Sequence, residues 1–213
     1  MEEIIEMKYN GNKIAYATYL IIVINLLFYA VEIKLGGSTN DAVLDFLGAL
    51  IPEKVDSGEW WRLIAANFLH YGTLHLVTNM LSLYVLGRLV ELILGVKSFL
   101  IIYLLSGTGA MFLFSEVALK TGEPVFLVGA SAAIMGLVGT ILSISLQVWL
   151  KKRNSINAKR LRLVILIIGL QFVFDNLIPQ VSFLGHLFGL IVGFLVGSFF
   201  VFWKFNFESP FGN

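Results

Sequence analysis

Six long apolar runs constrain the fold of this chain more than any other feature. They cover residues 14–33, 74–94, 98–119, 126–150, 161–178 and 181–204. A helix needs about 20 mostly apolar residues to cross a bilayer, and its backbone groups must then be hydrogen-bonded within the segment. The chain is 58% hydrophobic and only 14% charged, whereas soluble domains are usually about a quarter charged. We therefore predict an all-α membrane protein with six transmembrane helices.

The connection between the first two predicted helices, residues 34–73, is the one long loop. It contains the stretch "EWWRLIAANFL", which is amphipathic rather than uniformly polar. We find no repeat, low-complexity linker or second domain, so we expect a single domain over 1–213 with short tails at 1–13 and 205–213. The first residues are polar and acidic, which predicts that no signal peptide is cleaved.

Lysine and arginine are distributed unevenly over the two sides that six spans define. Most of the 15 fall on the side of both termini: Lys8, Lys13, Arg88, Lys97, Lys151, Lys152, Arg153, Lys159, Arg160, Arg162 and Lys204. The other side holds Lys34, Lys54, Arg62 and Lys120. Cytoplasmic loops carry the excess of positive charge, so we predict cytoplasmic termini, and the short tails suggest a prokaryotic plasma membrane. The basic cluster after the fourth span is either this topology signal or a lipid-headgroup site.

Three predicted spans enter the membrane from the outer side with polar residues in their first few positions. The second carries His75 and Asn79, the fourth Ser131 and the sixth His186. Polar groups inside a membrane are costly and usually face the bundle interior or a watery cavity. Three spans that place such groups at similar depth predict a shared polar site near the outer surface.

These residue types suit acyl-transfer chemistry. His75 and Asn79 are four apart on one helix face, from which both can donate hydrogen bonds toward an oxyanion. The imidazole of His186 can act as a general base, and a serine such as Ser131 needs a base to become a nucleophile. Each histidine alone could instead make an interhelical hydrogen bond, and the small residues around Ser131 could simply allow close helix packing.

His186 lies on one stripe of its span with three glycines that lie three, seven and eleven positions further on: Gly189, Gly193 and Gly197. A glycine stripe allows a neighbouring helix to approach closely. If that neighbour is the fourth span, His186 can reach Ser131. The small face of the fourth span points away from Ser131, which leaves this contact open; it consists of Gly129, Ala132, Ala133 and Gly136.

Three motifs together resemble the rhomboid family of intramembrane serine proteases. They are "EWWRLIAANFLHYGTLHLVTNMLSLYVLGRLVE", "GASAAIMG" and "GHLFGLIVGFLVG", and the resemblance extends from about Glu59 to Gly197. It implies a six-transmembrane-helix bundle of the rhomboid type with a long amphipathic outer loop between helices 1 and 2. It also implies a serine–histidine dyad without an acidic third member, with Ser131 as nucleophile and His186 as base.

The resemblance assigns further roles to matching positions. His75, Asn79 and the backbone N–H of Ser131 would form the oxyanion site. The structural positions of the motifs are Trp61, Arg62, His70, Glu91, Gly129, Gly189 and Gly193, with His70 and Glu91 expected to stabilise the loop. Asp175 matches a polar position near the outer end of the fifth helix. We expect a structural or gating role for it, because nothing in the sequence directs it toward His186.

Two positions depart from the family pattern. Many members have glycine after the serine, where this chain has Ala132, whose methyl group could crowd the turn that orients the N–H. Many members have an aromatic residue four positions after the serine, where a ring can pack on the histidine. Met135 occupies that place here, and its flexible thioether would fill the space less rigidly.

The implied function is cleavage of transmembrane segments of other membrane proteins near their outer ends. The partners would then be transmembrane protein substrates and the lipid bilayer, with entry between the second and fifth spans near Phe172 and Phe174. With no cysteine, three histidines and a net charge of +1, the chain suggests no metal, cofactor or nucleic acid. The alternatives are a non-proteolytic rhomboid-like binder of membrane proteins and a small transporter. Substrate and oligomeric state are left open.

Overall fold

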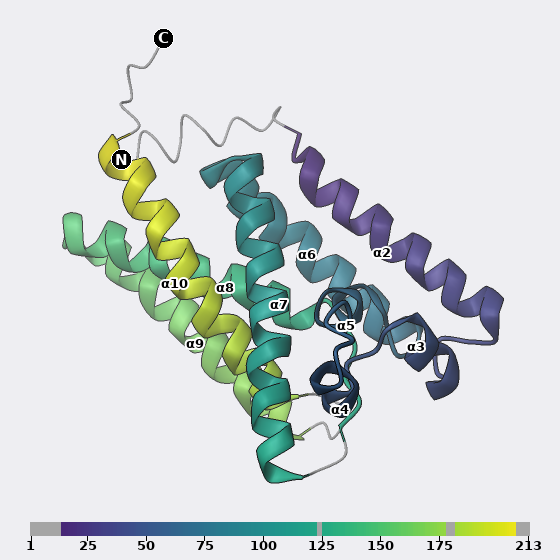
Figure 1. Ribbon diagram of the computed structural model, residues 1–213. Helices are drawn as coiled ribbons and strands as arrows, with labels where there is room; N and C mark the ends of the chain where they lie inside the picture. Colours follow the sequence, from purple (N-terminus) through teal and green to yellow (C-terminus); the bar gives the residue numbers. More distant parts are fainter. Residues whose placement is uncertain (1–13, 123–124, 178–181, 208–213) are drawn as a thin grey trace.

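The computed structural model describes residues 14–122, 125–177 and 182–207, in which every named element is a helix (Figure 1). The long helices are α2 (Tyr16–Leu35), α6 (Thr73–Leu94), α7 (Val96–Thr121), α8 (Ser131–Lys151), α9 (Ser155–Leu177) and α10 (Phe183–Phe207). The connection between α2 and α6 contains four short ones, which are α3 (Asp41–Leu47), α4 (Pro52–Asp56), α5 (Arg62–Ala65) and the 3-10 helix η1 (Ala66–Phe68).

Five of these helices, within the described residues, are long and apolar enough to cross a membrane: α2, α6, α7, α8 and α10. The prediction of an all-helical membrane protein is confirmed. The predicted span 161–178 falls on α9 apart from Ile178, which lies outside the described residues, as does Val181 of the last predicted span. Because α9 begins with basic residues and is not among the five, the count of six spans stays a prediction.

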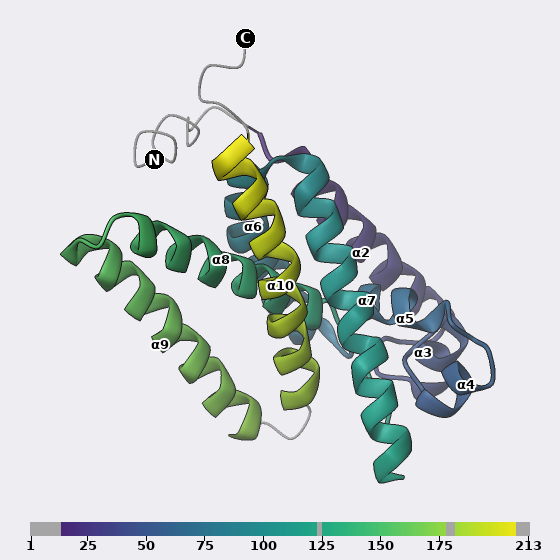
Figure 2. The ribbon, with the colours of Figure 1, turned by 60° about the vertical axis from the view of Figure 1, so that its left-hand side comes forward.

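Helix α8 packs most extensively against α10, then against α7 and α9. It is the most buried of the long helices, whereas α9 buries few side chains and α2 lies at the edge against α6. Figure 2 shows α8 and α9 joined at one end and diverging along their length, with α10 crossing α8. The candidate site is therefore carried by the best-packed part of the bundle.

Glycines on α10 allow its backbone to touch that of α8. A Cβ at Gly189 would collide with the carbonyl oxygen of Ala132, and one at Gly193 would collide with the backbone of Gly136. The hydroxyl of Thr140 on α8 also donates to the carbonyl oxygen of Gly193 at 3.0 Å. The predicted glycine stripe is confirmed, and the neighbour that it contacts is α8. The question that the sequence left open about the small face of α8 is thereby answered, since Ala132 and Gly136 do meet α10.

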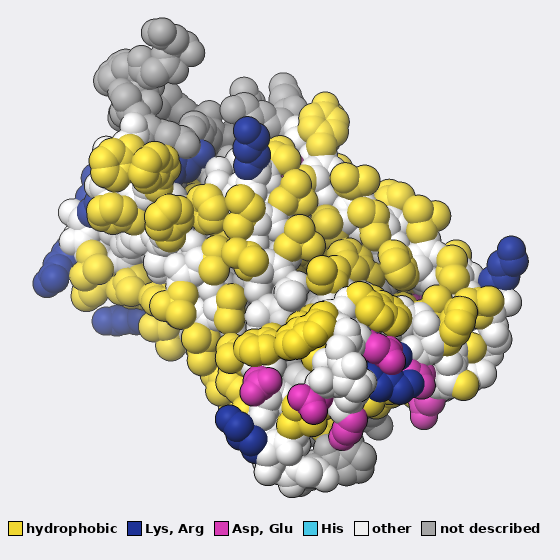
Figure 3. All heavy atoms as spheres, in the orientation of Figure 1, with side chains coloured by type: hydrophobic (Ala, Val, Ile, Leu, Met, Phe, Trp, Pro, Cys, Tyr) yellow, Lys and Arg dark blue, Asp and Glu magenta, His cyan; other side chains and the backbone are white. Residues whose placement is uncertain are grey.

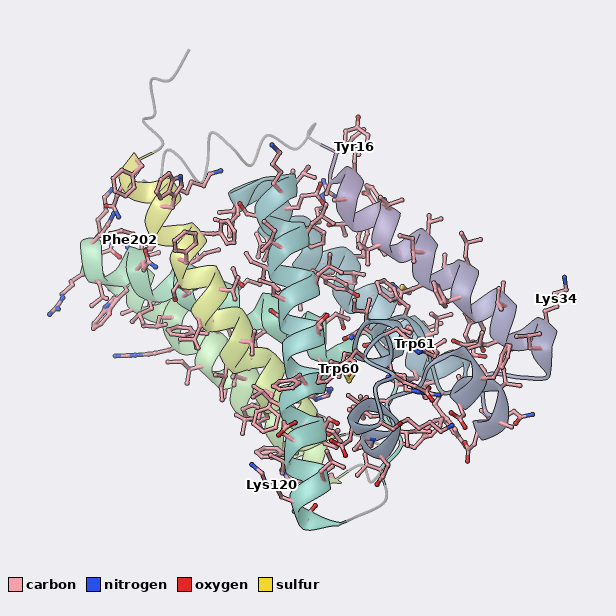
Figure 4. The ribbon with its side chains drawn as sticks, in the orientation of Figure 1. Tyr16, Lys34, Trp60, Trp61, Lys120 and Phe202 are labelled. Atoms are coloured by element: carbon pink, nitrogen blue, oxygen red, sulfur yellow. The ribbon has the colours of Figure 1, made fainter. Side chains whose placement is uncertain are left out.

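Charge and apolar surface are distributed as expected for a bilayer-spanning bundle. In Figure 3 hydrophobic side chains cover most of the visible face, and Lys and Arg lie mostly around its margin. Asp and Glu gather in the lower part of this face, over α3 to α5 and the adjoining part of α7, with basic side chains among them. Figure 4 shows Tyr16 and Phe202 toward one end of the bundle and Lys34 and Lys120 toward the other. The beginning of α2 and the end of α10 therefore lie at the same end, as an antiparallel arrangement of long helices requires.

Candidate active site

The segment just before α8 is not helical, so Ser131 is the first residue of that helix. Leu50 and Leu127 exchange backbone hydrogen bonds of 2.9 and 3.1 Å, and the N–H of Gly129 donates to the carbonyl oxygen of Ala66 at 2.8 Å. The predicted helical start at residue 126 was therefore wrong. The backbone groups ahead of Ser131 are hydrogen-bonded by the α2–α6 connection instead of by their own helix.

Gly129 makes the turn that leads into Ser131. Its φ is +129°, and a Cβ there would lie 2.7 and 2.8 Å from the His75 ring atoms Cε1 and Nε2, and 3.7 Å from Nδ2 of Asn79. Neither the backbone conformation nor the space admits a side chain. The structure therefore brings His75 and Asn79 of α6 against the turn that immediately precedes Ser131, whose own side chain is half-buried.

Both α6 side chains have a hydrogen-bond donor near this turn. Nδ1 of His75 accepts from the N–H of Tyr71 at 3.4 Å, so in a neutral ring the proton is on Nε2, the atom that faces Gly129. Asn79 is buried, and its Nδ2 makes no hydrogen bond to any part of the chain that the structure describes. Two N–H donors from one helix are thus available beside the turn at Gly129.

His186 lies in the first turn of α10 and is buried. Its Nδ1 lies 2.8 Å from Oδ2 of Asp175, and Nε2 of Gln171 donates to Oδ1 of the same carboxylate at 2.8 Å. Nothing in the sequence directed Asp175 toward His186, and this contact is seen only in the structure.

Ala132 and Met135, the two residues that depart from the family pattern, are both buried in the bundle. Ala132 is buried, and its carbonyl oxygen faces Gly189 of α10. Met135 is buried between α8 and α9, where it packs in a cluster with Ile168 and Phe172. Its thioether therefore helps to hold α9, the helix that carries Asp175.

Arg62 organises the α2–α6 connection, as its place in the tryptophan–arginine motif suggests. Its buried guanidinium donates to Oε2 of Glu59 at 2.7 Å and to the carbonyl oxygens of Asp45 and Ala49 at 2.9 and 2.8 Å. Asp45 also accepts from Lys54 at 2.6 Å, and this hydrogen bond lowers the pKa of Asp45. One arginine thus satisfies carbonyl groups that the short helices leave open.

Trp60 and Trp61 are partly exposed on the same connection, beside α7 (Figure 4). The guanidinium of Arg62 lies 5.0 Å from the Trp61 ring centre, and the ring also covers Gly48, where a side chain would collide with it. Trp60 stacks on Phe112 of α7 at 6.5 Å. Exposed tryptophans of this kind suit the boundary between lipid and water.

His70 is fully buried in the connection, and neither of its ring nitrogens has a hydrogen-bond partner among the described residues. Burial lowers its pKa to about 3, with a further contribution from His75. Its backbone N–H donates to Oε1 of Glu32 at 3.0 Å. Glu32, which the sequence analysis did not single out, therefore attaches the connection to the end of α2.

Glu91 stabilises a different element from the one expected. Its carboxylate accepts from the N–H groups of Ala17 and Thr18 at 3.0 and 2.7 Å and from the Thr18 hydroxyl at 2.7 Å. These amides lie in the first turn of α2, where backbone N–H groups have no partner within their own helix. Glu91 thus caps the beginning of α2 and does not touch the loop, because it lies near the opposite end of α6 from His75.

Within the described ranges, no three His, Asp or Glu side chains gather into a group that could hold a metal ion. The polar groups of the candidate site are a hydroxyl, an amide and two imidazoles, one of them paired with a carboxylate. This is a set of donors and bases rather than a set of metal ligands.

Comparison with known proteins identifies the class. A family model described as the rhomboid domain matches residues 57–203. Rhomboid protease GluP of Bacillus subtilis is 37% identical over 185 residues, which are 85% of this chain and 34% of that protein. RHOMBOID-like protein 5 of Arabidopsis thaliana is 37% identical over 151 residues, 71% of this chain and 47% of that protein. Rhomboid-like protease 2 of Toxoplasma gondii is 28% identical over 186 residues, 84% of this chain and 63% of that protein.

The chain belongs to the rhomboid family, and it is an integral membrane protein that crosses the bilayer several times. It spans about a third to a half of the length of the GluP and RHOMBOID-like protein 5 relatives.

Proposed function

We propose that the protein is an intramembrane serine endopeptidase that cleaves transmembrane segments of other membrane proteins. The observation that carries this proposal is the contact between α10 and the beginning of α8. Gly189 touches the backbone of Ala132, the residue after Ser131, and His186 lies one helical turn before Gly189. This register supports a pairing of the serine hydroxyl with the imidazole. The names of two relatives, GluP and Rhomboid-like protease 2, support proteolysis as the activity.

The proposed reaction begins with attack of Ser131 Oγ on the carbonyl carbon of the scissile peptide bond, while His186 Nε2 takes the serine proton. The carbon–nitrogen bond then breaks, the leaving amine takes the proton from Nε2, and an ester to Ser131 remains. Water attacks this ester and gives a proton to Nε2. Cleavage of the ester then releases the carboxyl product, and the proton returns to Ser131.

The negative oxygen of each tetrahedral intermediate needs donors that are already in place. We assign this role to Nε2–H of His75, the side-chain amide of Asn79 and the backbone N–H of Ser131. Their support is the position of His75 and Asn79 against the Gly129 turn and the absence, among the described residues, of any partner for Asn79 Nδ2.

Substrate entry fits the side of the bundle at α9. This helix packs mainly on α8 and only lightly on α10, and much of its apolar surface is exposed, including Phe174. We propose that a substrate helix approaches between α6 and α9. It must unwind there before a carbonyl can reach Ser131, because helical carbonyls are hydrogen-bonded. Segments with glycine or proline near the cleaved bond are therefore the preferred substrates.

The same charge asymmetry that predicted the topology supports an orientation with both termini in the cytoplasm. The end of the bundle with Lys34 and Lys120 would then face outward, together with the α2–α6 connection and Ser131. Protease protection of tags placed at the two ends of the chain, in sealed membranes, tests this orientation.

Reconstitution with a fluorescent model transmembrane substrate tests the activity. Ser131→Ala and His186→Ala should each abolish cleavage, and Asn79→Ala should raise the activation barrier by about 3 kcal/mol. Cleavage that continues in either of the first two variants would refute the pairing of Ser131 with His186.

A fluorophosphonate probe separates the protease from a non-proteolytic binder of membrane proteins. A protease should be labelled in the unmodified protein and not in Ser131→Ala. A binder should retain a substrate helix in detergent but show no labelling above that of the variant.

A further inference from the structure

We propose that Asp175 of α9 is a positioning residue that orients the imidazole of His186 on α10. This inference rests on the proposed function and concerns only the orientation of its histidine. The geometric basis is the 2.8 Å contact between Asp175 Oδ2 and His186 Nδ1, in which the aspartate side chain is fully buried.

The contact fixes which ring nitrogen carries the proton. A carboxylate can only accept hydrogen bonds, so Nδ1 of His186 must be the donor. In the neutral ring the lone pair is then on Nε2, the nitrogen that has to take the proton from Ser131. After that transfer the ring is positively charged, and the buried carboxylate beside it stabilises the charge.

The carboxylate is itself held in place. Gln171, one helical turn earlier on α9, donates to Oδ1 of Asp175 at 2.8 Å, which leaves Oδ2 for the imidazole. The rings of Phe172 on α9 and Phe183 on α10 meet at 5.1 Å and join the same two helices by an apolar contact. A carboxylate whose two oxygens both have assigned donors has little freedom to rotate.

The backbone that carries His186 is fixed in the same way. Ser182 precedes α10, and its hydroxyl oxygen accepts from the N–H of Gly185 at 3.0 Å, while its carbonyl oxygen accepts from the N–H of His186 at 3.1 Å. The first turn of α10 is thus capped at the point where the histidine projects. Asp175 then determines the ring orientation of a side chain whose backbone is already held.

The pair is buried and uses Nδ1 of the one histidine on α10. Nδ1 is the ring nitrogen on the far side from the one needed for catalysis, so the carboxylate can orient the imidazole without occupying Nε2.

Isotope labelling tests the proton position without any measurement of activity. The chain has 3 histidines, so protein made with ¹⁵N-histidine gives few imidazole signals, and the His186→Gln variant identifies those of His186. We expect the proton of His186 on Nδ1 in the unmodified protein and on Nε2 in Asp175→Asn, because an asparagine amide can donate to Nδ1. A proton on Nε2 in the unmodified protein would overturn the proposal whether or not the protein cleaves anything.

Kinetics test the consequence. In Asp175→Asn we expect kcat to fall by about 100-fold or more, KM to stay within about three-fold, and the melting temperature in detergent to change little. Asp175→Glu, which keeps a carboxylate, should recover part of kcat. Asn176→Ala is the matched control, since this neighbouring side chain is exposed and donates to the carbonyl oxygen of Phe172 in its own helix.

The possible failures are distinct. If the unmodified protein cleaves, Ser131→Ala does not, and Asp175→Asn keeps a normal kcat, the positioning role of Asp175 is refuted and the pair of Ser131 and His186 stands. If the unmodified protein neither cleaves nor reacts with fluorophosphonate, the proposed function fails, and the ¹⁵N signals alone decide the Asp175 inference. Should Asp175→Asn not fold, Gln171→Leu frees the carboxylate and should lower kcat by a smaller factor, and an unchanged kcat would count against the proposal.

Discussion

The first and last long helices, α2 and α10, are held to the bundle by opposite means. Helix α10 touches α8 through glycines, so its position depends on the shape of two backbones. Helix α2 is held near its two ends by carboxylates, with Glu91 capping its beginning and Glu32 binding the backbone of His70. We therefore expect steric substitutions to displace α10, the helix that carries His186. Changes of charge or pH should instead weaken the attachment of α2.

The largest expected effect is a steric one on α10. Gly193→Ala places a methyl group against the backbone of Gly136, and we expect it to lower the free energy of unfolding by about 3 kcal/mol. Gly169→Ala on α9 is the matched control, because a Cβ there meets nothing within 4 Å. Unfolding of both variants in mixed micelles checks the prediction, and equal stability of the two would show that the backbone contact does not hold α10.

The corresponding test on α2 removes a charge without removing bulk. In Glu91→Gln the amide nitrogen replaces one acceptor oxygen, so one of the α2 donors loses its partner, and we expect a loss of about 2 kcal/mol. Because the site lies toward the other end of α6, kcat should stay close to that of the unmodified protein. A stability equal to that of the unmodified protein would mean that water caps α2 equally well.

Acid should weaken the α2 side of the molecule through His70. Its pKa is about 3 in the folded protein and about 6.5 in an unfolded chain. Between these values the unfolded chain binds more protons than the folded protein. The contribution of His70 to the free energy of unfolding is therefore fully present above about pH 6.5 and is lost as the pH decreases toward 3. The slope is about 1.4 kcal/mol per pH unit, which gives roughly 2 kcal/mol at pH 5.

Thermal unfolding of the unmodified protein and of His70→Gln between pH 7.5 and about 4.5 measures this contribution. We expect a shallower dependence on pH in the variant, whatever its absolute stability. An identical slope in both proteins would assign the pH dependence to other groups.

The smallest expected effect is a polar one on the α8–α10 contact. Thr140→Val keeps the shape of the side chain but removes the hydrogen bond from its hydroxyl to the carbonyl of Gly193. Hydrogen bonds between transmembrane helices contribute about 0.6 kcal/mol on average, and we expect a loss of that size. Chemical unfolding resolves it, and a loss as large as that in Gly193→Ala would contradict the primarily steric attachment of α10.

Much of the fold was predictable because apolar length and glycine spacing are local signals. The observed long helices fall on the predicted spans, and the stripe from Gly189 to Gly197 does contact α8. The residues ahead of Ser131 were placed wrongly because an apolar segment such as 126–128 looks alike in a helix and in extended chain. Only its pairing with Leu50, far away in the sequence, decides between them.

The partners of single polar residues could not be predicted. Asp175 and His186 stand on different helices, and no spacing rule relates the orientation of one side chain to the other. Glu91 was expected to stabilise the loop because the sequence does not reveal which helix lies beside the end of α6. A buried carboxylate indicates that a partner exists, but only the packed bundle determines which one.

The cap on α2 has a consequence for the order in which the protein is assembled. The two amides that Glu91 accepts from lie 74 and 73 residues before it in the chain. During synthesis α2 therefore enters the membrane while these donors are still met by water or lipid headgroups, and its depth and tilt are free to vary. Helix α2, which is made before α6, becomes anchored only when the end of α6 arrives.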